Sequence, residues 1–148
     1  MAYSPQLFSR IAIAATMLSA VADRLGLWGD NASWGNWQNF EKYTAQLTFF
    51  LPEILSKFSA YAATSLEIIL SVMLISGFKT KIAAIATGIL LLIFALAMSI
   101  SLGIKAPLDY SVWIGSSAAF MLAAQNGNFP ARRQGGWRNR DCNQHSRT

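Results

Sequence analysis

The amino-acid sequence predicts an all-α membrane protein, a bundle of four transmembrane helices with an interfacial helix in its long first loop. Hydrophobic residues make up 53% of the 148 residues and charged residues only 13%, against roughly 25% charged residues in soluble chains. The apolar residues also gather in runs that are too long for the core helices of a small soluble domain. A chain this apolar must bury its surface, which excludes intrinsic disorder of the whole chain.

Four apolar stretches are long enough to cross the hydrocarbon core of a bilayer, which takes about 20 helical residues. The third stretch contains no charged residue, and the second contains only Glu67. The first stretch carries Arg10 near its start and Asp23 and Arg24 near its end. We expect transmembrane helices at 7–27, 58–78, 82–102 and 106–125.

The lysine and arginine residues predict the orientation, because they favour the cytoplasmic side of a membrane. An even number of spans puts both termini on one side. With the termini and the 77–81 loop inside, eight basic residues lie on the inner side and four on the outer side. We therefore expect both termini in the cytoplasm. The net charge of +5 then belongs to the cytoplasmic face and tail, and it predicts no nucleic-acid partner.

A second interpretation of the N-terminus is a signal peptide. Ile11–Ala22 is an apolar stretch after a basic residue, and Ala20-Val21-Ala22 resembles a signal-peptidase site. Cleavage after Ala22 would leave three spans. We favour an uncleaved first helix, because the segment before the stretch has little positive charge and apolar residues resume at 25–28.

The first loop, from Trp28 to Glu53, is rich in aromatic residues, which favour the membrane–water interface. Apolar residues recur at helical spacing within 36–51, where Asn36 suits an N-cap and Pro52 a stop. We expect an interfacial helix at 36–51 that either anchors the bundle or forms a lid over an outward-facing pocket. The candidate residues for such an outer-face site are Asp23, Arg24, Trp34, Trp37, Tyr43 and Asp109.

Glu67 lies near the middle of the second span, where an acid is costly unless it finds a partner inside the bundle. We expect it either to be ionised and paired with Arg10, or to be protonated and hydrogen-bonded to a hydroxyl group, and we favour the pairing. Asp23 and Arg24 are expected at the outer interface, where charges are solvated and long side chains reach toward water. The candidate buried polar site comprises Glu67, Arg10, Thr16, Thr64 and Ser71.

The sequence encodes few groups for catalysis or metal binding. Cys142 is the only cysteine and His145 the only histidine, which excludes an intramolecular disulfide, a cysteine–histidine metal cluster and a Ser-His-Asp triad. No phosphate-binding loop or nucleophile elbow occurs. Both residues lie in the polar segment 126–148, which we expect to be a basic, disordered cytoplasmic tail. We predict no metal site, and no cofactor is encoded.

The sequence resembles the DoxX family of small bacterial membrane proteins over about Ser9 to Gln125. The residues that carry the resemblance are Arg10 early in the first helix, Glu67 at mid-span, and the run from Glu67 through Gly77 to the basic turn at Lys81. An alanine-rich helix follows. The resemblance implies a four-helix, multi-pass protein of the bacterial plasma (inner) membrane with cytoplasmic termini, in which Arg10 and Glu67 are characteristic polar positions.

Members of that family are linked with redox systems, including a thiosulfate:quinone oxidoreductase subunit. The resemblance therefore implies an accessory subunit of a membrane redox system, with a quinone-like molecule held near Glu67. Expected partners are the lipid bilayer, a redox protein and a second copy of the chain in a homo-oligomer. Two alternatives stay open: a small proton-coupled transporter that uses Glu67, and a structural or assembly factor. No catalytic motif indicates an enzyme.

Overall fold

The computed structural model describes residues 3–125, and all regular structure within that range is helical. The expected tail, residues 126–148, lies outside the described residues. The elements in chain order are α1 (Tyr3–Arg24), the short 3-10 turn η1 (Gly29–Asn31), α2 (Trp37–Leu47), α3 (Glu53–Ser76), α4 (Thr80–Leu102), α5 (Lys105–Asp109) and α6 (Val112–Gln125).

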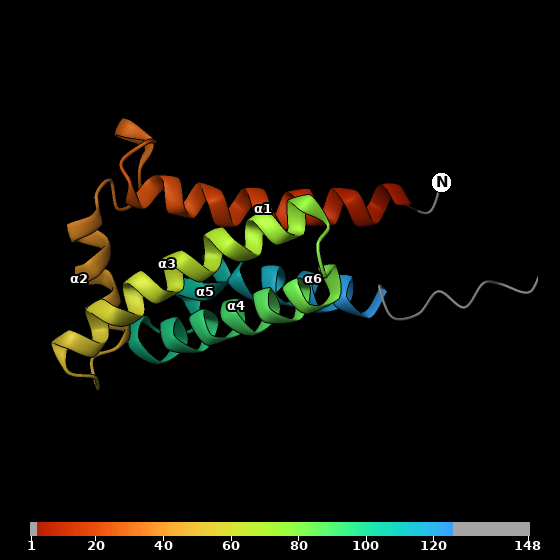
Figure 1. The fold of residues 1–148 in the computed structure, drawn as a ribbon. Helices are drawn as coiled ribbons and strands as arrows, with labels where there is room; N and C mark the ends of the chain where they lie inside the picture. Colours follow the sequence, from red (N-terminus) through yellow and green to blue (C-terminus); the bar gives the residue numbers. More distant parts are fainter. Residues whose placement is uncertain (1–2, 126–148) are drawn as a thin grey trace, which may run out of the picture.

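The helices of the bundle, α1, α3, α4 and the shorter α6, run along one axis, and α2 lies across one end of the bundle (Figure 1). The start of α1, the α3–α4 turn and the end of α6 lie together at the opposite end (Figure 1). Three helices, at Pro5–Arg24, Glu53–Ser76 and Thr80–Leu102, are long and apolar enough to cross a membrane. The chain is therefore a multi-pass membrane protein.

The fourth expected span, 106–125, is not one continuous helix. The chain breaks at Tyr110 and Ser111, where Ser111 adopts a φ of 55°. This break leaves α5 with 5 residues and α6 with 14 residues. At a rise of about 1.5 Å per residue, α6 is about 21 Å long, which is shorter than a hydrocarbon core of about 30 Å. Among the described residues, the structure thus shows three candidate spans and a shorter apolar helix.

A helix forms within the segment that was predicted to be interfacial, but it is shorter than 36–51. Its N-cap is Asn36 as expected, because the Asn36 side chain accepts a hydrogen bond from the backbone N–H of Asn39. The helix ends at Leu47 rather than at residue 51. The hydroxyl of Thr48 then donates to the Oγ of Ser56, 2.8 Å away, which ties the end of α2 to the start of α3.

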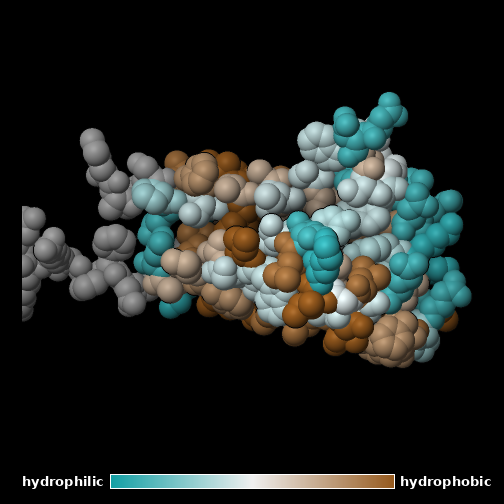
Figure 2. Space-filling model, turned by 180° about the vertical axis from the view of Figure 1, so that it is seen from behind, coloured by the Kyte–Doolittle hydropathy of each residue, from teal (hydrophilic) through white to brown (hydrophobic). Residues whose placement is uncertain are grey.

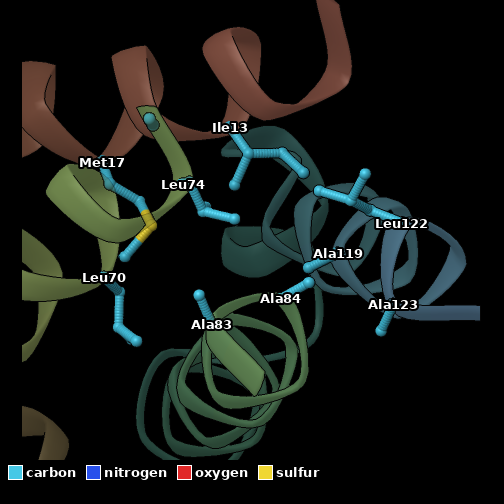
Figure 3. Close-up of a cluster of buried hydrophobic side chains, with 10 residues drawn as sticks. Ile13, Met17, Leu70, Leu74, Ala83, Ala84, Ala119, Leu122 and Ala123 are labelled. Atoms are coloured by element: carbon cyan, nitrogen blue, oxygen red, sulfur yellow. The ribbon is translucent and has the colours of Figure 1, made fainter. Parts of the chain in front are cut away.

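The hydrophobic core lies between α1, α3, α4 and α6 and is packed with small residues. Leu74 of α3 and Leu122 of α6 are fully buried between alanines such as Ala83 and Ala84 (Figure 3). Small residues let helices approach closely in a membrane. Helix α1 contributes Ile13, Ala14 and Met17, so signal cleavage after Ala22 would remove part of this core.

Arg10 fastens α1 to the end of α3. Its Nε donates to the carbonyl oxygen of Leu74 at 2.8 Å, and its Nη2 donates to that of Ile75 at 3.2 Å. These carbonyls belong to the last turn of α3, whose orphan acceptors and partial negative charge attract a cation. Gly77 ends the helix with a φ of 76°, and a Cβ there would lie 2.6 Å from Nη2 of Arg10.

The outer surface of the helices is apolar, as expected for helices that face lipid. Large hydrophobic side chains on α1, α3 and α4 are exposed along their length. Figure 2 shows hydrophobic groups along the flank and hydrophilic groups concentrated at the end that carries α2. This distribution matches a bundle whose middle lies in lipid and whose loops reach water.

Candidate functional site

A buried ion pair joins the end of α1 to the middle of α3. Arg24 Nη1 lies 2.5 Å from Oε2 of Glu67, and Nη2 lies 3.0 Å from Oε1. Arg24 Nη1 also donates to the hydroxyl of Thr64 at 2.8 Å. Both charged side chains are 4% exposed. Two parallel N–H···O bonds fix both groups more strongly than a single contact would.

The expected pairing of Glu67 with Arg10 is wrong. Helices α1 and α3 are antiparallel, and their register places Arg10 beside the last turn of α3 and Arg24 beside Thr64 and Glu67. The expectation of a solvated Arg24 is wrong for the same reason. Because α1 ends beside the middle of α3, its last residue lies inside the bundle, where it is 3% exposed.

Asp23 holds the first loop against this ion pair. Its carboxylate accepts hydrogen bonds from the backbone N–H of Ser33 at 3.0 and 3.1 Å and of Trp34 at 3.3 Å. The loop passes so close to the end of α1 that a Cβ on Gly26 would lie 2.8 Å from the carbonyl oxygen of Gly35. Asp23 is 7% exposed, so it is also buried rather than solvated.

Aromatic rings cover the Arg24 guanidinium. Its central carbon lies 4.0 Å from the ring centre of Phe40 and 5.6 Å from that of Trp34. Trp34 in turn contacts Phe40 and Tyr43, with ring centres 5.4 and 5.5 Å apart. A cation over an aromatic face in a desolvated site gains about 2 kcal/mol. Helix α2 therefore forms a roof over the ion pair.

Beneath this roof lies an apolar cavity of about 510 Å³ between α2, α3 and α4. Its volume is in the range of about 300–1,000 Å³ that is typical of small-molecule sites. Arg24 and Glu67 line it, together with the aromatic side chains Trp34, Phe40, Tyr43, Phe58, Phe94 and Tyr110. Burial raises the pKa of the Tyr43 hydroxyl, and the neighbouring Tyr110 adds to the rise, so Tyr43 keeps its proton at neutral pH.

Several expected site residues lie elsewhere. Thr16 donates to the carbonyl oxygen of Ile13 on its own helix. Ser71 is fully buried, and its hydroxyl has no hydrogen-bond partner among the described residues. Asp109 pairs with Lys105 on the surface. Trp37 lies against Tyr61, with the ring centres 4.6 Å apart and the rings tilted by 41°, and it donates to the carboxylate of Glu41.

The structure brings together residues from both expected sites. Arg24, Asp23, Trp34 and Tyr43 were expected at the outer face, whereas Glu67 and Thr64 were expected in a separate buried site. Phe40, which lies directly over the guanidinium, was missed as a site residue. Its place at helical spacing from Trp37 and Thr44 is the signal that could have identified it.

Most charged groups of the site are already engaged within the protein. Among residues 3–125, no three acidic, histidine or cysteine side chains lie close enough together to hold a metal ion. The acid and the base of the ion pair bind each other, and the Asp23 carboxylate accepts from backbone amides. The remaining free features are the apolar cavity, the Tyr43 hydroxyl and the Nε of Arg24, which has no hydrogen-bond partner among the described residues.

Comparison with known proteins corrects the family. Residues 3–109, well over half of the chain, match the family described as methylamine utilisation protein MauE. No curated protein and no solved structure matches the chain. The resemblance to DoxX proteins, which rested on polar positions and a basic turn in apolar helices, is therefore wrong as an assignment. The chain belongs to the MauE family.

Proposed function

We propose that this protein is a non-catalytic membrane subunit of a redox system for methylamine utilisation, placed in the bacterial plasma membrane with its termini in the cytoplasm. The family match over residues 3–109 is the observation that carries the proposal. A redox partner protein supplies the electron-transfer groups, because the described residues include no cysteine and no histidine. The chain contributes a fixed arrangement of helices in the membrane.

The geometry of the ion pair supports this role over that of a proton-coupled transporter. A transporter needs Glu67 to gain and lose a proton during each cycle. Glu67 instead makes two hydrogen bonds to Arg24 inside the bundle, which hold its carboxylate in a fixed ion pair. The rings of Phe40 and Trp34 contact the Arg24 guanidinium, which further fixes the position of the pair.

Deletion of the gene in its native host tests the proposal. The deletion should abolish growth on methylamine as the nitrogen source and leave growth on ammonium unchanged. Wild-type protein should restore growth. Glu67→Gln should restore it poorly. The surface variant Glu53→Gln is the matched control and should restore it fully, since Glu53 is exposed and pairs with the exposed Lys57.

Equal growth of the deletion strain on both nitrogen sources would refute the methylamine role. Affinity purification in mild detergent provides the second readout. A redox protein that copurifies with the wild-type chain and with the Glu53→Gln variant, but less with Glu67→Gln, would support an accessory subunit held in shape by the ion pair.

A further inference from the structure

We infer that the apolar cavity beneath α2 binds one neutral, lipid-like molecule that carries a carbonyl acceptor and an extended apolar chain, and that this molecule enters from the bilayer. The inference goes beyond the proposed function and does not depend on the link to methylamine. It rests on the lining of the cavity, on the exposure of its rim and on two free hydrogen-bond donors.

The rim of the cavity faces lipid. Phe58 and Leu66 on α3 and Ile93 on α4 line the cavity and are 73%, 46% and 56% exposed. Both helices are long and apolar enough to span a membrane, so side chains that are exposed along them meet acyl chains. The cavity therefore opens sideways between α3 and α4, and an apolar molecule can enter without crossing water.

The inner end of the cavity offers donors without matching acceptors. Arg24 is 3% exposed and lines the cavity, and its Nε has no hydrogen-bond partner among the described residues. An unpaired buried donor costs about 1–3 kcal/mol, so an acceptor oxygen on a bound molecule would stabilise the site. Tyr43 also lines the cavity and is half-buried, so its hydroxyl offers a second donor.

The charges at this end select a neutral head group. Asp23, Arg24 and Glu67 together carry one formal negative charge, which disfavours an anionic head. A cationic head finds no free carboxylate, because Glu67 is bound to Arg24 and Asp23 to loop amides. A carbonyl oxygen accepts from both free donors without adding charge. Membrane quinones and the ester groups of glycerolipids share this chemistry.

Native mass spectrometry of the full chain in nanodiscs tests the inference. The probe is decylubiquinone, a neutral dione with a ten-carbon chain, and decylbenzene is the control without an acceptor. We expect one bound decylubiquinone per chain. Decylbenzene should bind about 5–100-fold more weakly, because it lacks two hydrogen bonds to the head group that contribute about 0.5–1.5 kcal/mol each. Equal binding of the two probes would overturn the recognition of a carbonyl.

Two neighbouring residues on α4 locate the binding site. Ala97 lines the cavity, whereas Leu96 does not line it and is 48% exposed. Ala97→Phe fills part of the cavity and should weaken decylubiquinone binding about tenfold, since overfilling a packed space costs about 1–3 kcal/mol. Leu96→Phe is the matched control and should bind as the wild type does. Equal binding by both variants would show that the cavity is not the site.

Tyr43→Phe tests the polar end without removing the aromatic roof. It should reduce the preference for decylubiquinone over decylbenzene and leave decylbenzene binding unchanged. An unaltered preference would exclude the Tyr43 hydroxyl as a donor to the head group.

The protein purified without added probe distinguishes the two natural sources of the ligand. A retained quinone and a retained glycerolipid differ in mass, and either one supports the inference. A chain that retains neither and binds no probe would refute it.

Discussion

The Arg24–Glu67 ion pair should dominate the stability of the contact between α1 and α3. Glu67→Gln keeps the size of the side chain but leaves a guanidinium that is 96% buried without its carboxylate. Breaking one side of a buried ion pair costs about 3–5 kcal/mol. We expect a loss near 3 kcal/mol, because an amide oxygen still accepts one hydrogen bond and the ring of Phe40 stays in contact with Arg24.

The double variant provides the decisive measurement. Arg24→Gln alone strands the Glu67 carboxylate and should cost a similar amount, whereas the double variant removes both charges together. It should therefore be more stable than the sum of the single losses predicts, with a coupling free energy of about 2–3 kcal/mol. Unfolding by sodium dodecyl sulfate in mixed micelles, followed by tryptophan fluorescence, gives each free energy of unfolding.

The exposed pair of Glu53 and Lys57 is the matched control for this cycle. Its atoms also lie close, at 2.8 Å, but its side chains are 78% and 53% exposed. Solvent screens such a helical pair, so its coupling free energy should be far smaller than that of the buried pair. If the cycle on Arg24 and Glu67 gives a coupling as small as this control, the buried pair does not hold the two helices together.

Three further results are expected. Asp23→Ala should destabilise the protein by about 1–3 kcal/mol and expose the first loop to proteolysis, because two loop amides lose their charged acceptor; an unchanged cleavage rate would contradict this. Gly77→Ala should lower the free energy of unfolding by about 1–3 kcal/mol, since a Cβ is strained at positive φ and would contact the Arg10 guanidinium that caps α3. A thermal-shift assay in detergent measures this loss. In a Cys142→Ser background, Asp30→Cys should react with an impermeant maleimide in intact cells and Thr80→Cys only after permeabilisation; the reverse pattern would invert the topology.

Much of the helical architecture could be predicted from the sequence, because it depends on local patterns. Long apolar runs predicted the helices around Glu67 and along 82–102, and Asn36 correctly marked the start of α2. Composition alone placed the protein in the membrane. The break at Ser111 could not be predicted, since nothing in an apolar stretch shows that one residue will adopt positive φ.

The candidate site depended on the tertiary structure. Glu67 was identified from the cost of an acid at mid-membrane, which is a property of one helix. Its partner depends on the register between α1 and α3, and no local pattern encodes that register. Two arginines lie on α1, and only the packed structure shows that Arg10 reaches the end of α3 while Arg24 reaches Glu67. The cavity also depends on how the helices pack. Because α1 ends beside the middle of α3, α2 covers the first half of α3 and leaves the cavity that Arg24 and Tyr43 line.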